Sequence, residues 1–371
     1  MQNQRKQWGE APWSRANFPK QAITAAGVRV AIIGGGLTGA STAYHLGKHG
    51  VPSTVFEAGL VGDGASGRTG GIVLEGTASG PLPGADSCLD TLENLVATEQ
   101  IDCGLRRSGC WEIEHRAGSN GRKLPWDDGG KPVYIATTVD GGTVQPAALL
   151  AGIMSAAARL GAEIREHTRV VRIVMEPRLA LEVAGKQIYP EYVVVAVNAW
   201  INALISNVVA LRSALTFACL TEPLEPATLK AVGMNAGMPF YTADLPYLWG
   251  RTTSDGRAVF GSGLVFGAPA RLEKMDASTG AAGAALAQLR NRIQSLHPKL
   301  RAVRFSGSWG GPIAFTDDTL PLLGVHPQNS RVLVSGGYAG HGVALSVHAG
   351  QLIAEAITED RPLPDWGSLR R

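Results

Sequence analysis

A glycine-rich turn between two short apolar runs is the feature that most constrains this chain. The first run, Val30–Ile33, is typical of a buried parallel strand, and the second, Val51–Phe56, ends at Glu57. Between them lie the letters GGGLTG and a stretch of helical spacing that ends at Gly50. A strand, a glycine turn, a helix and a second strand make up one unit of a doubly wound α/β sheet. The sequence therefore predicts a domain of Rossmann type.

The spacing of the glycines also predicts what this unit binds. Gly34 permits the tight turn, Gly36 lets a pyrophosphate approach the backbone, and Gly39 lets the helix pack closely on the strand. The start of the helix presents N–H groups to the phosphates, and Glu57 is placed to hold ribose hydroxyls. An acid at this position favours NAD or FAD over NADP. The alternative is a glycine-rich turn that binds nothing.

Composition narrows the class of protein. The chain has 371 residues, which suits two domains, and 45% of them are hydrophobic, which is enough for buried cores. The net charge of +3 comes without any Lys/Arg run, so no nucleic-acid partner is inferred. The cysteines form no C-x-x-C pair and are predicted to be free thiols in a reduced compartment, hence a cytoplasmic protein: Cys88, Cys103, Cys110 and Cys219.

The N-terminal arm, residues 1–26, leaves two interpretations open. It lacks the apolar stretch of a signal peptide, and no run in the chain is long enough to span a bilayer. Aromatic and basic residues alternate in it, which is compatible with contact to a membrane surface. Packing on its own domain or on a partner subunit is the favoured interpretation. The residues concerned are Trp8, Trp13, Phe18, Arg5, Lys6 and Arg15.

A second glycine-rich segment favours FAD over NAD. The stretch GDGASGRTGGIVLEG, Gly62–Gly76, follows the ribose acid directly. It suits a ligand whose phosphates and ribityl chain continue beyond the first turn, as in FAD. Ser66, Arg68 and Thr69 are placed to contact pyrophosphate or flavin. A flexible surface loop is the alternative.

With three further motifs the chain resembles the D-amino-acid-oxidase-type FAD-dependent oxidoreductases, which include glycine and sarcosine oxidases, D-amino acid dehydrogenases and γ-glutamylputrescine oxidoreductase. The motifs are VVVAVNAW (193–200), SWGGPIAFTDDTLPLLG (308–324) and GGYAGHGVALSVHAGQLIAEAI (336–357). The resemblance covers nearly the whole chain after the arm. Thr69 stands where many relatives have Asn, and no cysteine lies near the C-terminal motifs. The resemblance therefore implies a dissociable FAD, with attachment through a histidine as the alternative.

The resemblance also implies which residues meet FAD. The backbone near Val170 and Val171 would meet the adenine, and the helix from Val343 would direct its N–H groups at the pyrimidine end of the flavin. His341 is expected to touch flavin or substrate, with packing in a tight turn as the alternative and acid–base catalysis as a minor one. The full set is Gly34, Gly36, Leu37, Thr38, Gly39, Glu57, Ala58, Ser66, Arg68, Thr69, Gly70, Gly71, Val170, Val171, Asn198, Ala199, Trp200, Gly311, Gly340, His341, Gly342 and Val343.

The expected fold is α/β: a Rossmann-type FAD-binding domain (GR2-like) and a mostly antiparallel α+β substrate domain. We assign residues 27–86, 140–210 and 304–371 to the first and residues 87–139 and 211–303 to the second. A helix is predicted to begin at Pro146, and a three-stranded β insertion is predicted from EIREH, RVVRIVM and LALEVAG. TEPLEPATL is predicted to be a proline-bounded loop, and Ala284–Leu296 has the spacing of an amphipathic helix.

The reaction implied by the resemblance is oxidation of a C–N bond in a small-molecule amine or amino acid. Hydride passes to flavin N5, and water hydrolyses the imine. The electron acceptor is open between oxygen, a quinone and a carrier protein. Two alternatives are an FAD oxidoreductase acting on a hydroxy acid and an FAD-binding subunit of a heteromeric dehydrogenase. A homo-oligomer is also compatible. No metal-ligand spacing is present.

Substrate contacts are expected on the hairpin Asp244–Gly263. Tyr247, Trp249 and Arg251 alternate, so they share one face of a strand. If that face points at the flavin, the aromatic residues form a wall and Arg251 binds a substrate carboxylate through two hydrogen bonds. If it points away, these three predicted catalytic residues are ordinary sheet surface. Trp309 is expected either to line the pocket or to be a buried structural residue.

Overall fold

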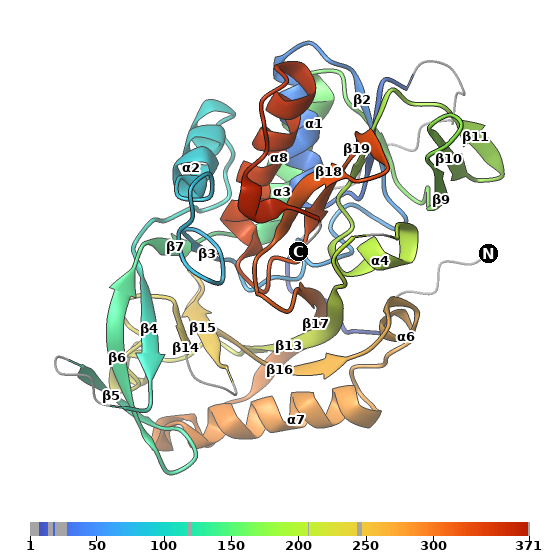
Figure 1. The fold of residues 1–371 in the computed structure, drawn as a ribbon. Coiled ribbons are helices and arrows are strands. Elements are labelled where there is room, and N and C mark those ends of the chain that lie inside the picture. Colours follow the sequence, from blue (N-terminus) through green and yellow to red (C-terminus); the bar gives the residue numbers. More distant parts are fainter. Residues whose placement is uncertain are drawn as a thin grey trace.

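The structure is a computed structural model that describes residues 7–13, 18, 28–116, 121–206, 208–242 and 247–369. The chain forms a mostly parallel sheet with helices against it, next to a mostly antiparallel sheet with the long helix α7 on its far side (Figure 1). This confirms the predicted fold class.

The parallel sheet is built around β1, whose side chains are all buried. β1 pairs in parallel with β2 on one side and with β12 on the other, which brings together segments far apart in the sequence. Only β18 runs antiparallel, among the described strands of this sheet. The strands, in spatial order, are β18 (Leu322–His326), β19 (Asn329–Gly336), β12 (Tyr192–Val195), β1 (Val30–Ile33), β2 (Ser53–Phe56) and β8 (Glu163–Arg165).

Four helices with largely apolar, small-residue faces belong to this half of the described chain: α1 (Leu37–Lys48), α2 (Cys88–Thr98), α3 (Pro146–Arg159) and α8 (Gly342–Thr358). α1 and α8 approach closely, because a Cβ on Gly350 would lie 2.5 Å from the Cβ of Ser41. α3 begins where the sequence predicts, with Pro146 in its first turn and the Gln145 side chain accepting a hydrogen bond from the Ala148 N–H.

The small β insertion exists, but one of its strands was predicted wrongly. It consists of β9 (Val170–Val174), β10 (Ala180–Val183) and β11 (Lys186–Ile188). The stretch EIREH instead supplies β8, which pairs in parallel with β2. Three residues of β8 extend the parallel sheet at its edge, and KQI, which carries no strong strand signal, completes the insertion.

The antiparallel sheet has a core of large aromatic side chains, among them Phe217, Phe240 and Phe260. α7 (Gly280–Ser295) packs on it through Leu286, Leu289 and other buried residues, which confirms the predicted amphipathic helix. The strands, in spatial order, are β17 (Phe305–Phe315), β13 (Arg212–Thr221), β16 (Ala258–Phe266), β15 (Trp249–Thr252), β14 (Phe240–Thr242), β4 (Cys110–Glu114), β6 (Pro132–Val139) and β5 (Arg122–Asp127).

Two elements cross the predicted domain boundaries. α2 was assigned to the substrate domain, but its buried leucines belong to the core beneath α8. β17 was assigned to the FAD-binding domain, but it pairs with β13 in the antiparallel sheet. The division into domains itself remains a prediction.

Short elements complete the described chain. TEPLEPATL was predicted to be a loop, but its second half begins the helix α5 (Pro226–Ala231), which starts at a proline as short helices often do. The others are β3 (Ile72–Leu74), β7 (Gly141–Thr143), α4 (Ile201–Leu204), α6 (Pro269–Glu273) and the 3-10 turns η1 (Asn198–Trp200), η2 (Pro298–Leu300) and η3 (Asp365–Gly367).

The described part of the N-terminal arm packs on the protein, and the cysteines are free thiols, as the sequence predicts. Trp8 is completely buried and Trp13 is partly buried, so this part of the arm packs on its own protein. Arg5, Lys6 and Arg15 lie outside the described residues. All four cysteines are buried and unpaired. No helix in the described ranges combines the length and apolar character needed to cross a bilayer.

Candidate functional site

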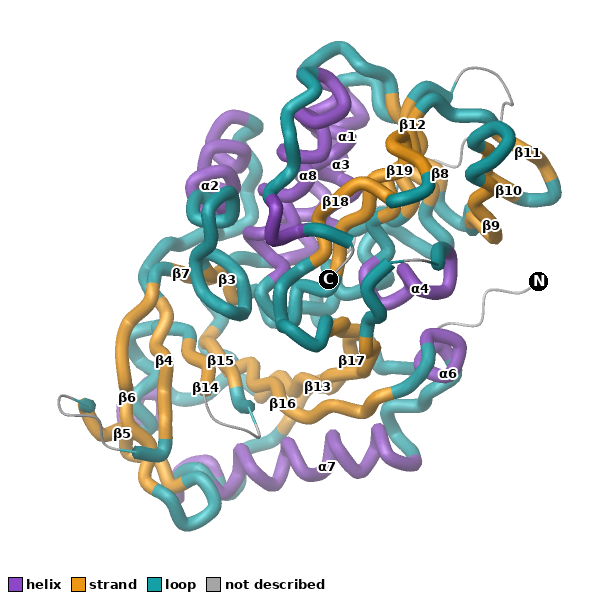
Figure 2. The backbone as a smooth tube through the Cα atoms, in the orientation of Figure 1, coloured by secondary structure: helices purple, strands orange, loops and turns teal. Residues whose placement is uncertain are grey.

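A cavity of about 830 Å³ lies between the two sheets, at the carboxyl ends of the parallel strands. Ile33 and Phe56, the last residues of β1 and β2, line it on one side, and Ala218 of β13 and Gly311 of β17 line it on the other. Figure 2 shows loops concentrated in this region. In open α/β sheets, ligands bind outside the carboxyl ends of the strands. The cavity is therefore the candidate active site.

The glycine turn after β1 forms one wall of the cavity and tolerates no side chains at two positions. Gly34 has a φ of +114°, and a Cβ there would lie 2.5 Å from the Ala196 carbonyl oxygen. A Cβ on Gly39 would lie 2.0 Å from the carbonyl oxygen of Gly34. Gly36 borders the cavity and meets only the Ser66 side chain, at 2.9 Å. The turn therefore brings bare backbone to the cavity at the start of α1, as a pyrophosphate requires.

Glu57 ends β2 with its carboxylate held in place. One oxygen accepts a hydrogen bond from the Gly35 N–H at 2.8 Å and the other accepts from the Gly59 N–H at 2.7 Å. Glu57 also borders the cavity. Each carboxylate oxygen can accept more than one hydrogen bond, so this group retains capacity for the hydroxyls of a ribose.

The second glycine-rich segment lines the cavity and is fixed by neighbours, so the surface-loop alternative fails. The Ser66 hydroxyl accepts a hydrogen bond from the Leu37 N–H at the start of α1, at 3.0 Å. The Arg68 guanidinium donates to the carbonyl oxygens of Gly9, at 2.8 Å, and Gly310, at 3.1 Å. These bonds connect the loop both to the start of α1 and to β17.

The turn that precedes α8 closes another side of the cavity. His341 stands just before the helix, and its backbone N–H donates to the Tyr338 carbonyl oxygen at 2.9 Å. The Tyr338 hydroxyl bonds to the Thr38 hydroxyl of α1 at 2.7 Å. The Asn198 side chain accepts from the Gly337 N–H at 2.8 Å. Three distant segments are thereby held around the cavity.

His341 lies against a tyrosine in the cavity wall. Its Nδ1 atom is shielded from solvent and has no hydrogen-bond partner among the described residues. Burial lowers the pKa of the imidazole, and the Ala339 carbonyl partly offsets this effect. The Tyr241 ring stands edge-on to it at 6.1 Å, and the Tyr241 hydroxyl donates to a Glu112 carboxylate oxygen at 3.0 Å. Burial and Glu112 raise the pKa of Tyr241 above its usual range. Both rings are therefore neutral at pH 7.

The two predicted aromatic residues, Tyr247 and Trp249, also line the cavity. The Trp249 ring packs directly over the backbone of the glycine-rich loop, because a Cβ on Gly70 would lie 2.1 Å from it. Tyr247 bonds to the Thr216 hydroxyl and donates to the Gly263 carbonyl oxygen at 2.9 Å. Burial raises the pKa of Tyr247 to about 12, so its phenol stays protonated. The first three residues of the predicted hairpin, residues 244–246, lie outside the described chain.

Arg251 is not placed to bind a substrate carboxylate, and this expectation requires correction. It does not line the cavity, and only 6% of it is exposed. Its guanidinium donates to the carbonyl oxygens of Gly70 and Val144 and lies over the Trp13 ring, 5.5 Å from the centroid. Burial lowers its pKa to about 10, which leaves it charged at pH 7. Arg251 therefore braces the loop instead of presenting a free cation.

We expect Arg251→Ala to destabilise the fold instead of raising KM for substrates that carry a carboxylate. Removal of the guanidinium leaves the Gly70 and Val144 carbonyl oxygens without this donor, at a cost of about 3 kcal/mol. Denaturant unfolding of the FAD-free protein measures the loss. Arg290→Ala is a control, because the exposed Arg290 donates to the hydroxyl of the half-buried Ser308, outside the cavity. A selective rise in KM with unchanged stability would contradict this role.

Most predicted FAD contacts border the cavity, and contact with FAD itself remains a prediction. Three do not border it. Gly39 faces Gly34, a Cβ on Gly71 would point at the Val144 carbonyl oxygen, and the Ala199 carbonyl accepts from Ser213. The predicted residues that do border it are Gly34, Gly36, Leu37, Thr38, Glu57, Ala58, Ser66, Arg68, Thr69, Gly70, Val170, Val171, Asn198, Trp200, Gly311, Gly340, His341, Gly342 and Val343.

Sequence reasoning missed two tyrosines of the site. Tyr241 precedes the predicted hairpin. Tyr338 lies inside the GYAGHG motif, of which only glycines and the histidine were predicted to be site residues. An alternating FYT stretch was the only signal for Tyr241. Trp309 meets both of its expectations, because it borders the cavity and is 1% exposed.

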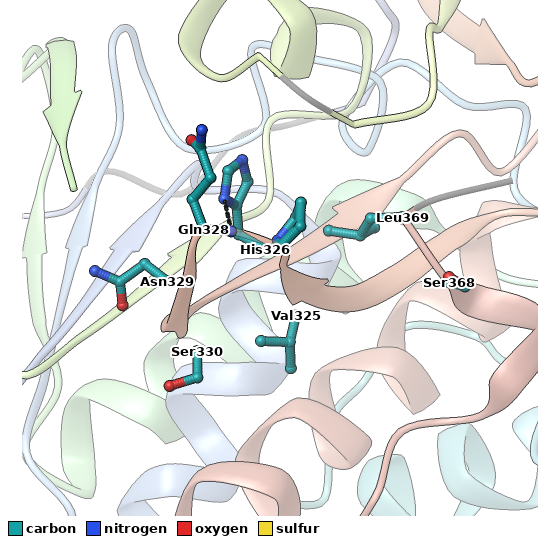
Figure 3. A pocket seen from close by; sticks show the side chains of 8 residues that line it. Val325, His326, Gln328, Asn329, Ser330, Ser368 and Leu369 are labelled. Carbon is teal, nitrogen blue, oxygen red and sulfur yellow. Dashed lines mark hydrogen bonds between the residues drawn. The ribbon is translucent and has the colours of Figure 1, made fainter. Parts of the chain in front are cut away.

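A second hollow lies at the turn between β18 and β19, lined by His326, Gln328 and their neighbours (Figure 3). Both ring nitrogens of His326 are engaged, one with the Ser206 carbonyl oxygen and one with the Gln328 N–H. Nothing in this hollow offers a reactive group. In the described parts of the chain no cluster of three His, Cys, Asp or Glu residues is able to hold a metal ion.

Comparison with known proteins places these features in a wider context. The family of FAD dependent oxidoreductases (DAO) matches residues 29–356. The γ-glutamylputrescine oxidoreductase of Escherichia coli (strain K12) is 26% identical over 374 residues, covering 89% of this chain and 84% of that protein. The glycine oxidase of Geobacillus kaustophilus is 27% identical over 365 residues, covering 88% and 92%.

Solved structures agree with this fold. The crystal structure of glycine oxidase from Geobacillus kaustophilus superposes with a TM-score of 0.73 at 22% identity, covering 92% of this chain and 98% of that one. L-proline dehydrogenase from P. horikoshii gives a TM-score of 0.73 at 19% identity, covering 95% and 98%.

Proposed function

Because this chain belongs to the DAO family of FAD-dependent oxidoreductases, we propose that it oxidises the C–N bond of a small amine or amino acid in the cavity between its two sheets. The observation that carries the proposal is the continuity of the cavity. It extends from the glycine turn and Glu57 to the aromatic wall beside His341. One end suits a dinucleotide, and the other end has room for a small substrate.

The residues of the cavity fit FAD. The bare backbone at Gly36 and the start of α1 would hold the pyrophosphate, and Glu57 would hold a ribose. The start of α8 would direct its N–H groups at the flavin ring. FAD, when bound, supplies the acceptor for the hydride. None of the four cysteines borders the cavity, which supports a non-covalently held FAD.

The aromatic wall would select the reactive form of the substrate. An amine must be uncharged to release hydride from the neighbouring carbon. Tyr241, Tyr247 and Trp249 line this end of the cavity. With a substrate bound their rings would exclude water, and desolvation lowers the pKa of a bound ammonium. His341 is neutral at pH 7, so one of its ring nitrogens accepts a hydrogen bond from the amine.

Anaerobic titration tests this function. The purified protein is expected to bind FAD, and its visible flavin absorbance should bleach when one class of amine or amino acid is added. Readmission of air then distinguishes oxygen as acceptor from a quinone or a carrier protein. Bleaching by a hydroxy acid and by no amine would replace the proposal with the alternative chemistry. Failure to bind FAD would remove its basis.

A yellow protein that no amine, amino acid or hydroxy acid bleaches would instead favour a subunit of a heteromeric dehydrogenase. Copurification from the native source would then identify the partner, and the titration would be repeated on the assembly. If an amine or amino acid bleaches the flavin only when the partner is present, the assembly carries out the proposed C–N oxidation.

A further inference from the structure

The N-terminal residues 7–13 form a segment, here called the strap, that contacts both the antiparallel sheet and the glycine-rich loop at residues 68 and 69. Trp8 anchors it in the core of the antiparallel sheet. Its side chain is completely buried, and its indole N–H donates to the Leu272 carbonyl oxygen at 2.8 Å. The ring also packs near Trp200, with 6.3 Å between centroids. The strap is therefore part of the folded structure.

The backbone of the strap covers the edge strand of the antiparallel sheet. β17 is the terminal strand in the order of that sheet, and its Gly310 N–H donates to the Trp8 carbonyl oxygen at 2.6 Å. Gly9 adopts a φ of +76°, and a Cβ there would lie 2.4 Å from the Ser308 carbonyl oxygen. Only glycine allows the strap to lie this close to β17.

The other side of the strap holds the glycine-rich loop that borders the cavity. The Gly9 carbonyl oxygen accepts the hydrogen bond from Arg68, and the same guanidinium lies over the Trp8 ring, 5.3 Å from its centroid. The Trp13 indole N–H donates to the Thr69 carbonyl oxygen at 3.1 Å. Both Arg68 and Thr69 line the cavity. The strap thus contacts two consecutive parts of this loop.

Trp13 is itself enclosed by residues of the site. Its ring stands edge-on to Trp309, with 6.0 Å between centroids, and Arg251 lies over it. The Trp309 indole N–H donates to the Arg68 carbonyl oxygen at 2.8 Å. Arg251 donates to the carbonyl oxygen of Gly70, the residue that follows Thr69. Strap, loop and β17 therefore share one hydrogen-bonded network.

We propose that the strap positions residues 66–70 for FAD, so that retention of the cofactor depends on a segment that lines none of the cavity. This inference rests on the proposed function. A loop that is ordered before binding loses less conformational entropy when the ligand arrives. When the strap is displaced, the loop must be ordered by FAD itself, and affinity falls. Gly9 and Trp13 are accordingly positioning residues.

Gly9→Ala and Trp13→Ala test the proposal. The first places a methyl group against the Ser308 carbonyl oxygen, and the second removes the donor to Thr69. We expect each variant to bind FAD about tenfold more weakly, or about 1.4 kcal/mol. Reconstitution of the FAD-free protein gives Kd, and the rise of flavin fluorescence after dilution gives the rate of release. Trp13→Phe keeps the ring but not the N–H group, and should lose part of the affinity.

Two control variants match these changes outside the network. Gly50→Ala introduces a methyl group at a φ of +68° where no atom lies within 4 Å. Trp366→Ala removes an indole that donates to the Pro83 carbonyl oxygen at 2.7 Å, away from the cavity. Both should retain wild-type affinity for FAD, measured well below the unfolding temperature of each FAD-free variant.

The possible results are distinct. Wild-type affinity in Gly9→Ala and Trp13→Ala would overturn the role of the strap. Equal losses in the controls would do the same, because they would reduce the effect to general destabilisation. If the wild-type protein fails to bind FAD, the proposed function fails first. If the wild type binds FAD and the strap variants bind it weakly, both proposals stand.

Discussion

Gly36→Val is expected to abolish FAD binding while leaving the FAD-free protein folded. The new side chain would stand at the edge of the cavity where the pyrophosphate must approach the start of α1. Its nearest neighbour, at 2.9 Å from the position of a Cβ, is the hydroxyl of Ser66, the end of a side chain that can rotate away. The fold therefore has room to adjust, but the ligand does not. We expect Kd for FAD to rise at least about 100-fold, or about 2.7 kcal/mol.

Titration of the FAD-free protein with FAD measures this change, and thermal unfolding without FAD reports on the fold. Gly185→Ala is a suitable control, because Gly185 lies in the distant turn between β10 and β11 with nothing within 4 Å of a Cβ. Normal FAD affinity in Gly36→Val would mean that the pyrophosphate lies elsewhere.

The second large effect is expected at His341. His341→Leu removes both ring nitrogens and leaves an apolar side chain of similar length in the cavity wall. The amine would lose its hydrogen-bond acceptor beside Tyr241, and the rate constant of anaerobic flavin reduction should fall about 100-fold, because a polar group left without its partner in a desolvated site costs up to about 3 kcal/mol. FAD affinity should change little, since backbone N–H groups at the start of α8 remain.

His348 provides a matched control on the helix that follows His341. It is a buried histidine of α8 whose pKa is also lowered, but it bonds to Thr91 and Gly84 and does not line the cavity. His348→Leu should therefore reduce its flavin at the wild-type rate. Equal rates in the wild type and His341→Leu would restrict His341 to packing in the turn.

Both histidines also affect how stability depends on pH. Burial lowers the pKa of each below the ordinary value of 6.5 in the folded protein. As the pH falls below 6.5, the unfolded chain binds protons that the native protein does not, so the native state loses stability. Replacing either histidine should reduce this loss. The two variants are thus expected to agree in acid stability and to differ in flavin reduction.

Local signals in the sequence predicted which residues border the cavity around the glycine turn. The glycine turn, Glu57 and the loop at 66–70 each act through a few consecutive residues, so their spacing alone constrains their geometry. The same holds for the start of α8. The backbone geometry of each of these motifs is set by its own consecutive residues, so it can be predicted before the tertiary contacts between the motifs are known.

Partners distant in sequence could not be predicted in this way. The alternation of Tyr247, Trp249 and Arg251 placed three side chains on one face, yet Arg251 reaches past the cavity to carbonyl oxygens of Gly70 and Val144. EIREH has the same strand character whether it joins β2 or the insertion, and only tertiary pairing decides between them. The strap could not be predicted from its own sequence, because its hydrogen-bond partners lie in β17 and in the glycine-rich loop.

The hydroxyl bond between Thr38 and Tyr338 spans 300 positions of the chain, and it has a consequence for biosynthesis. A ribosome that has made only the first βαβ unit has produced the glycine turn and Glu57, but not the turn at Gly337 or the helix α8 that packs on α1. Contacts of such long sequence separation form late and slowly. We therefore expect the nascent chain to bind its cofactor only when nearly the whole polypeptide has been synthesised, and a chain truncated before α8 to be colourless.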